Sequence, residues 1–326
     1  VRGGVGADGN RREGAEDEAL IAQHSGETSS LCALFHVRMQ AWVASLASLA
    51  TAGACGADSG TALARDVQDA FVAVLHQWLR TLDALLEELR SKYECQNPNA
   101  DNLFSSIDEG YPLLRFLASL VEWRESNLPV LVDTFAGQWG VTDGGRELTA
   151  QLVRRSLDLE TRVSDAFIDV VVAPVRVLLE SEWCCRLAWS AGHVKDVRPH
   201  TQTTILHFVL VYAETVRVAP SLSAHIMTCL VHAVLSAALS VVQRGAVGAL
   251  KPHEREQMEV EVRLWVQVMR SHVAPSAAQT VQQIYDALRR GGTAREPTEA
   301  MQDVIRGEVA RNSVLWGCFL TKQSHE

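Results

Sequence analysis

The chain has 326 residues, of which 47% are apolar and 21% charged, a balance typical of soluble proteins with a large core. Its net charge is −9 and it contains no block of Lys or Arg, which argues against nucleic acid or an anionic membrane surface as a partner, because both need concentrated positive charge. The seven cysteines have irregular spacing and form no CxxC, so a reducing compartment such as the cytosol fits better than a disulfide framework.

Residues 1–27 are rich in Gly and charge and poor in aromatic residues, so we expect a flexible tail there. The run GGVGADG within this tail resembles a phosphate-binding loop. Such a loop needs a strand before it and an apolar helix after it, and the sequence offers neither. We therefore expect no nucleotide site in the tail.

From residue 28 onward, apolar residues recur at helical spacing nearly to the end of the chain. The stretch TSSLCALFHVRMQAWVASLASLA begins with hydroxyl residues that are suited to capping a helix. The next helix carries a single apolar stripe with steps of three and four residues, long for a globular protein. The residues of this stripe are Leu63, Val67, Phe71, Val74, Trp78, Leu82, Leu85 and Leu89.

Breakers such as NPNADN at 97–102 and the pair Gly144 and Gly145 separate the later helices. We expect these helices near 112–123, 127–139, 146–183, 201–218, 221–243, 252–272, 275–290 and 298–320. Pro174 is expected to kink the helix that contains it. No stretch shows sustained strand alternation, so the sequence predicts an all-α protein with antiparallel helices and short connections.

The segment IMTCLVHAVLSAALSVV, residues 226–242, is the best candidate for a membrane span. It is at the short end of the spanning length and contains His232. Its Ser and Ala content suits a helix that is packed on all sides by protein. We expect a buried helix and no membrane span.

The stretch SEWCCRLAWSAGHVKD, residues 181–196, combines Cys184, Cys185, two tryptophans and His193. Adjacent residues of a helix point about 100° apart, so the two thiols would not easily share one metal ion. A thiolate nucleophile would also need a base and positive surroundings. Packing at a helix end explains Trp183 and Trp189 more simply than chemistry does.

His225, Cys229 and His232 step by four and three and therefore lie on one helix face, a feasible spacing for metal ligands. His200 and His207 are similarly two turns apart. No carboxylate shares the turns of 225–232 to orient the histidines, and Cys is often buried as a small apolar residue. We leave a metal site here as an alternative and expect packing.

Three further motifs are incomplete. HEREQ at 253–257 has half of a zinc-protease motif but Gln257 where the second His is required. ADSG at 57–60 resembles a serine-protease nucleophile loop without a β-barrel to hold it. No Asp-Asp pair occurs for a terpenoid-cyclising site. We therefore expect no catalytic, cofactor-binding or metal residues and no cofactor.

The segment order from about residue 127 to the end resembles the C-terminal region of the exocyst complex component 2 family, most closely over 150–319. The similarity begins with LPVLVDTFAGQW and with the long helix LDLETRVSDAFIDVVVAPVRVLLESE. It continues with a Trp followed by Val-Lys and Arg, here Trp189, Val194, Lys195 and Arg198. The turn His272-Val273-Ala274-Pro275-Ser276-Ala277 and the ending RNSVLWGCF, which closes in Cys318-Phe319, are similar as well.

The resemblance implies an elongated rod of stacked antiparallel helical bundles, as in multisubunit tethering complexes. The chain would be a non-catalytic exocyst subunit that helps tether secretory vesicles to the plasma membrane, cytoplasmic and peripheral to both membranes. Its partners would be the other exocyst subunits. The family binds Ral GTPases through an immunoglobulin-like domain near its N-terminus; no strand-rich segment occurs here, so small GTPases would bind through regions outside this chain.

We expect three regions: a flexible tail at 1–27, an N-terminal helical bundle region at 28–140 and a C-terminal helical bundle region at 141–326. Three other functions stay open. One is a subunit of another rod-like tether, Golgi or endosomal, or an unrelated helical scaffold. The others are an all-α enzyme or metal protein that uses the 225–232 face, and a membrane protein.

Overall fold

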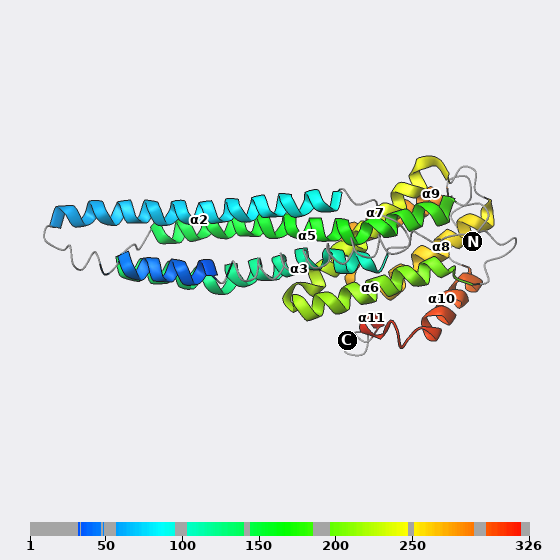
Figure 1. The fold of residues 1–326 in the computed structure, drawn as a ribbon. Coiled ribbons are helices and arrows are strands. Elements are labelled where there is room, and N and C mark those ends of the chain that lie inside the picture. Colours follow the sequence, from blue (N-terminus) through cyan, green and yellow to red (C-terminus); the bar gives the residue numbers. More distant parts are fainter. Residues whose placement is uncertain are drawn as a thin grey trace, which may run out of the picture. The chain divides into compact units, whose positions relative to one another are not determined.

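The fold was analysed in a computed structural model (Figure 1). It describes residues 32, 34–46, 48, 57–94, 103–139, 144–184, 196–246, 251–289 and 298–320. These residues form helices and the turns between them, and no strand occurs among them. The predicted all-α helical-bundle fold is confirmed.

The described residues divide into two compact units. The first unit draws on Val1–Gln96 and Tyr111–Phe167, and the second on Asn97–Gly110 and Ile168–Glu326. Helix α5 (Gly144–Cys184) contributes to both, because the division falls within it. The predicted division of the chain at 27/28 and 140/141 stays a prediction.

The first unit is built from the helical residues 34–46, most of α3 and the first part of α5, together with three complete elements. These are α2 (Ala57–Glu94), the π-helical segment η2 (Trp123–Asn127) and α4 (Leu128–Trp139), while α3 itself spans Ser105–Glu122. Stacked rings join its helices: Phe35 lies 4.2 Å from Trp78, and Phe71 lies 4.1 Å from Phe135 between ring centroids.

The apolar stripe of α2 faces the core of the first unit. Val67, Phe71, Trp78, Leu82 and Leu89 are buried, as the sequence predicts, while Val74 and Leu85 are partly exposed. Neighbouring leucines at 75, 79 and 86 complete the buried face. The core side of the helix is therefore broader than a single stripe, as expected for a helix that packs against more than one neighbour.

Helices α2 and α5 run parallel. Arg155 bonds to His76 and Arg162 pairs with Asp83, and both pairs span 79 residues of sequence. A constant separation means that both helices advance in the same direction. In the sequence, the segment from α3 to α4 lies between these two helices, so it must run in the opposite direction. This gives the up-down-up order of a bundle with short loops.

The predicted break between α3 and α4 is a π-helical turn and not a loop. At η2 the N–H of Leu128 donates to the carbonyl oxygen of Trp123, five residues earlier. Pro129 follows directly and has no N–H to continue the α-helical ladder. The wider turn accommodates that loss, so Ser105–Trp139 continues as one helical pass.

The second unit contains the start of α3, the end of α5 and a series of shorter helices. These are α6 (Pro199–Val218), η4 (Pro220–Leu222), α7 (Ser223–Val241), η5 (Val242–Ala246), α8 (Pro252–Val268), η7 (Arg270–His272), α9 (Pro275–Arg289), α10 (Glu299–Arg311) and α11 (Gly317–Leu320). Two predicted helices are shorter than expected, because 252–272 ends as a 3-10 turn and 298–320 is interrupted by the turn 312–316.

Proline and capping residues set where these helices begin. Pro199, Pro252 and Pro275 each occupy the first position of a helix, where a missing N–H costs nothing. At α10, Oγ1 of Thr298 accepts a hydrogen bond from the N–H of Met301 at 3.3 Å. These local signals position α6, α8, α9 and α10, which hold the features discussed below.

One described segment, Pro220–Arg244, is long and apolar enough to cross a membrane by length and composition. Just over half of its most apolar window, 56%, is buried within the protein. Its helix α7 contacts α6 and α9. A core helix has the same composition, so the prediction that this chain does not span a membrane stays a prediction.

Candidate functional site

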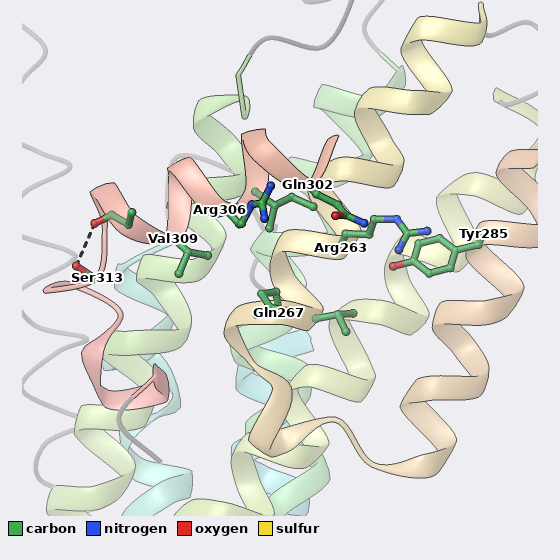
Figure 2. Close-up of a pocket in the computed structure, with 10 residues that line it drawn as sticks. Arg263, Gln267, Tyr285, Gln302, Arg306, Val309 and Ser313 are labelled. Atoms are coloured by element: carbon green, nitrogen blue, oxygen red, sulfur yellow. Dashed lines mark hydrogen bonds between the residues drawn. The ribbon is translucent and has the colours of Figure 1, made fainter. Parts of the chain in front are cut away.

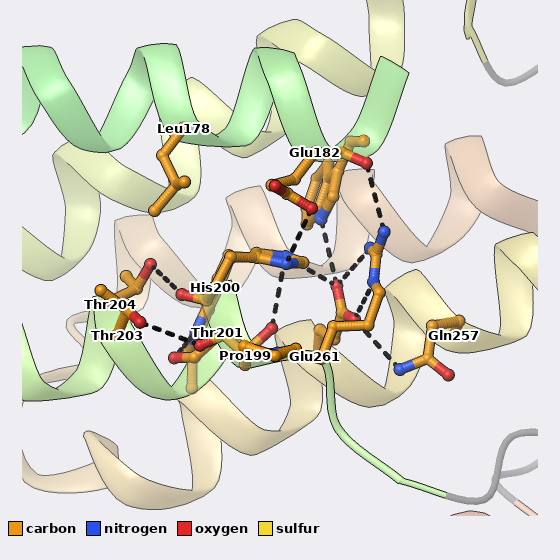
Figure 3. Close-up of polar contacts among 12 residues, drawn as sticks. Leu178, Glu182, Pro199, His200, Thr201, Thr203, Thr204, Gln257 and Glu261 are labelled. Carbon is orange, nitrogen blue, oxygen red and sulfur yellow. Dashed lines mark hydrogen bonds and ion pairs between the residues drawn. The ribbon is translucent and has the colours of Figure 1, made fainter. Parts of the chain in front are cut away.

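A carboxylate on α8, Glu261, gathers hydrogen bonds from three elements of the second unit (Figure 3). Arg198 precedes α6 and donates from Nε to Oε1 at 2.6 Å and from Nη2 to Oε2 at 2.7 Å. Trp183 of α5 donates from Nε1 to Oε2 at 3.1 Å. Gln257, one turn earlier on α8, donates to Oε1 at 3.0 Å, and Nε2 of His200 lies 3.3 Å from Oε2.

The Glu261 side chain is fully buried. Burial alone would raise the pKa of its carboxyl, but the hydrogen bonds and charges of Arg198 and His200 outweigh burial and lower that pKa to about 2. The carboxylate is ionised at neutral pH, and donors surround both of its oxygens. We interpret the cluster, which we call the Glu261 network, as a structural connection between α5, α6 and α8.

A second buried carboxylate, Glu308, attaches α10 to the same region. It accepts hydrogen bonds from Nε2 of Gln202 on α6 at 2.5 Å and from Nδ2 of Asn312 at 2.6 Å. Arg311 pairs with Glu308 and also with Asp196, where Nη2 lies 2.7 Å from Oδ1. The polar groups of this face of α10 are therefore used for packing within the unit.

The candidate metal face on α7 is only partly assembled. Nε2 of His225 lies 3.7 Å from Sγ of Cys229, and His232 is one turn further along. Within the ranges that the structure describes, no three His, Cys, Asp or Glu side chains are grouped so that they could hold a metal ion. The helical spacing places His225, Cys229 and His232 on one face, but it does not group them closely enough to hold a metal ion.

His200 and His207, the other histidine pair, serve different contacts. His200 belongs to the Glu261 network, whereas Nε2 of His207 donates to the carbonyl oxygen of Val171 at 2.9 Å. Burial lowers the pKa of His207 to about 4, against a smaller raising effect of that hydrogen bond. His207 is therefore a neutral core residue at physiological pH, which links α6 to α5.

Most of the stretch 181–196 lies outside the described residues: the structure describes neither residues 185–195 nor the side chain of Cys184. Trp183 is described and is fully buried. Its ring stacks on that of Trp265 with centroids 5.9 Å apart, and its N–H belongs to the Glu261 network. The predicted packing role of Trp183 is confirmed, while the roles of Trp189 and His193 stay predictions.

The incomplete motifs occupy helix starts. Within HEREQ, Glu254 accepts the backbone N–H of Lys251 at 2.6 Å, which caps α8, and Gln257 contacts Glu261. The residues ADSG, at 57–60, form the first turn of α2 and not a loop between helices. The run GGVGADG lies outside the described residues.

A groove of about 560 Å³ lies between α8, α9 and α10, and we call it the α8–α10 groove (Figure 2). From α10 it is lined by Gln302, Ile305, Arg306, Val309 and Ala310, with Ser313 added from the following turn. From α8 and α9 it is lined by Arg263, Val266, Gln267 and Tyr285. Its size is within the range of ligand and peptide sites, and its lining is mainly apolar with two arginines.

Arg263 is fixed at one end of this groove. Its Nη2 pairs with Oε1 of Glu259 at 2.6 Å, and its guanidinium lies over the ring of Tyr285, 4.6 Å from the centroid. Arg289 pairs with the same Glu259 oxygen at 2.6 Å. Burial raises the pKa of Tyr285 to about 12, so its hydroxyl stays protonated. The arrangement presents cations and a neutral phenol without nucleophile or general base.

A smaller groove of about 410 Å³ lies in the first unit between residues 34–42 and α2. It is lined by the apolar or aromatic side chains of Leu34, Phe35, Met39, Trp42, Val74 and Trp78, together with Arg38. Leu34 is half exposed. Grooves with such linings are more typical of surfaces that bind other proteins than of catalytic clefts.

Comparison with known families decides between the functions that the sequence leaves open. The family model for exocyst complex component Sec5 matches residues 21–319. The chain belongs to this family. The match extends well beyond the region from residue 127 onward where the resemblance was noted, and it includes the helices of the first unit. No curated protein and no solved structure matches the chain.

Membership makes this chain an exocyst subunit of the vesicle-tethering type. Members of the exocyst interact with one another, and the complex is cytoplasmic and acts at the plasma membrane and vesicles. Members of this family are non-enzymatic tethering subunits. This agrees with the Glu261 and Glu308 clusters, whose polar groups bond to one another within the second unit. The alternatives of a Golgi or endosomal tether and of an unrelated scaffold are therefore set aside.

Neither the Glu261 network nor the α8–α10 groove was predicted from the sequence. Apart from Gln257, the partners of Glu261 are the distant residues Trp183, Arg198 and His200, so no local spacing indicates the network. The α10 side of the groove does carry a signal, a stripe at positions 302, 305, 306, 309, 310 and 313. Because Gln, Arg and Ser interrupt the stripe, it is easily taken for an ordinary solvent face.

Proposed function

We propose that this chain is exocyst complex component 2 of its cell and works as an assembly subunit without catalytic activity. It acts from the cytoplasm, peripheral to the plasma membrane and to secretory vesicles. Its helices bind the other exocyst subunits, and it helps hold a vesicle at the plasma membrane before fusion. The observation that carries this proposal is the family match over 21–319, most of the chain.

The chemistry of the described residues supports an assembly role. Both fully buried carboxylates, Glu261 and Glu308, accept hydrogen bonds from side chains of the same unit. The lining of both grooves combines apolar or aromatic side chains with arginine, and the larger groove adds Gln and Ser side chains. The net charge of −9 favours protein partners over nucleic acid.

The test is affinity purification of the tagged full chain from its native cells, with co-purifying proteins identified and quantified by mass spectrometry. Stoichiometric recovery of the other seven exocyst subunits is the expected result. Recovery of a different tether set, or of the chain alone, would overturn the proposal. A second preparation with the tag at the opposite end of the chain is the control for a tag that blocks a contact.

Absence of catalysis and of a cofactor is part of the proposal. Elemental analysis of the purified complex should find less than stoichiometric zinc or iron bound to this chain. A stoichiometric metal that is lost in a His225→Ala variant would contradict it and would return attention to the α7 face. Small GTPases are proposed to bind through regions outside this chain, so a GTPase-loaded resin should not retain the isolated chain.

The proposed organisation of the chain is a flexible tail at 1–27 followed by helical bundle regions at 28–140 and 141–326. Limited proteolysis of the purified chain should cut first within the tail and next near residue 140. A first cut within the described helices would contradict this organisation, because the backbone of a packed helix resists cleavage.

A further inference from the structure

The α8–α10 groove has the shape that a helix requires. The α10 residues that line it lie at positions 302, 305, 306, 309 and 310, so they form one stripe over about two turns, roughly 12 Å. Ser313 adds to this side from the turn that follows α10. Figure 2 shows Gln302, Arg306 and Val309 following one another along α10. Side-chain ridges at this spacing accept the ridges of another helix. The described residues contain no strand, so pairing with a sheet edge is not available here.

The charge of the groove selects the partner. Two arginines line it and none of its lining residues is acidic, although the chain as a whole carries a net charge of −9. Arg306 is 68% exposed, and only its Nη2 is engaged among the described residues, with Asp303. Its other N–H groups face solvent and can meet a carboxylate of a partner.

Two exposed apolar residues follow the last groove residue, Ser313, in the sequence. Val314 and Leu315 follow Ser313 directly and are 92% and 59% exposed. Single exposed apolar residues are common, but two in succession beside an apolar groove extend one surface. Both belong to the turn 312–316, in which Trp316 is buried.

We propose that the α8–α10 groove binds an amphipathic helix of another exocyst subunit, with apolar side chains every three to four residues and acidic side chains beside them. The inference rests on the proposed function, because it assigns a surface to the assembly role. The apolar residues of the helix would contact Val266, Ile305 and Val309. Its carboxylates would meet Arg306, because Nε and Nη2 of Arg263 are already bound to Glu259.

The first test changes the charge of the groove without changing its fold. Arg306→Glu should reduce the recovery of one exocyst subunit at least about tenfold, because like charges would then face each other at the rim. Arg217→Glu on α6 is the matched control. Arg217 is 59% exposed and also pairs with a carboxylate three residues earlier, Glu214, but it lies outside the groove.

A second variant protects the test against misfolding. Val314→Asp changes a side chain that is 92% exposed, so it should leave the thermal unfolding temperature within about 2 °C of the original. It should reduce recovery of the same subunit as Arg306→Glu does. If both variants recover all seven subunits at the original level, the groove proposal is wrong while the proposed function stands. If the unaltered chain recovers none, the proposed function itself fails.

The occupant is identified by photo-crosslinking within the assembled complex. Ala310→p-benzoylphenylalanine places the probe on an exposed position of the groove, and mass spectrometry identifies the linked peptide. A link to an acidic amphipathic segment of another exocyst subunit supports the proposal. A link to residues 290–297 of this chain, a link to a second copy, or a complete complex without any link would each overturn it.

Discussion

The Glu261 network and the α8–α10 groove, two regions of the second unit, use charge in different ways. Glu261 is fully buried and surrounded by donors from α5, α6 and its own helix, whereas Arg263, two residues later, lines a groove on the surface. The charge of Glu261 fixes helices to one another. On the groove side Arg263 is itself held by Glu259, and the exposed charge is that of Arg306 on α10. The comparison sets a buried network that connects helices beside a surface groove that we propose to serve assembly.

The comparison predicts its largest effect at Glu261. Glu261→Gln removes the negative charge that faces Arg198. It also places an amide N–H, which is a donor, where the surrounding side chains already supply donors. We expect a loss of about 3–5 kcal/mol in the free energy of unfolding, the range for breaking one side of a buried ion pair. Urea denaturation followed by circular dichroism measures it. A loss below about 1 kcal/mol would show that the network does not hold the helices together.

The same network should make stability depend on pH. The pKa of Glu261 is lowered from 4.5 to about 2, so its contribution is complete above about pH 4.5 and is lost as the pH falls towards 2. The difference in unfolding free energy between the original chain and Glu261→Gln should therefore narrow by about 3 kcal/mol across this window. A difference that stays constant between pH 6 and pH 3 would contradict the assignment.

His207 should produce a second pH effect at higher pH. Its pKa is lowered from 6.5 to about 4 by burial, so the unfolded chain takes up a proton before the folded one. Stability should fall by roughly 2 kcal/mol between pH 6.5 and pH 4.5, and His207→Gln should lack this fall. Unfolding curves at half-unit pH intervals compare the two slopes. Equal slopes would exclude His207 as the cause.

Trp183 should show a smaller effect. Trp183→Phe keeps most of the stacking on Trp265 but removes the N–H that donates to Glu261. We expect a loss of about 1–2 kcal/mol, from one hydrogen bond to a charged group and a small change in packing. Thermal unfolding measures this loss. Its matched test is the double variant with Glu261→Gln, whose effect should be less than the sum of the two.

The smallest effect is predicted on the groove side of the comparison. Asp303→Asn removes the exposed partner of Arg306, and pairs that are this exposed contribute at most about 0.5 kcal/mol to stability. Urea denaturation should therefore hardly distinguish the variant from the original chain. A loss as large as that of Glu261→Gln would mean that Asp303 and Arg306 stabilise the fold, as the Glu261 network does.

Local sequence patterns predicted much of the fold and little of the two polar clusters. The stripe on α2 and the prolines at 199, 252 and 275 act within a few residues, so the helices and their starts can be read from sequence. The π turn at Trp123–Asn127 was missed because break signals do not distinguish a loop from a wider helical turn.

The Glu261 network depends on packing between distant helices, and no spacing rule contains that information. The reverse holds for the α7 face. His225, Cys229 and His232 share a face as predicted, yet a shared face supplies only neighbouring ligands, and the remaining ones must come from other helices. Family membership, in contrast, could be inferred from segment order, because the order of helices and breaks extends over most of the chain.

The most direct test of the whole account measures unfolding free energy and exocyst recovery for Glu261→Gln and Arg306→Glu side by side. We predict that Glu261→Gln lowers stability by several kcal/mol, about 3–5, while the molecules that stay folded still recover all seven subunits. Arg306→Glu should keep the original stability and lose one subunit at least about tenfold. If Arg306→Glu recovers every subunit at the original level, or if both variants fail in the same way, stability and assembly are not divided between the Glu261 network and the α8–α10 groove.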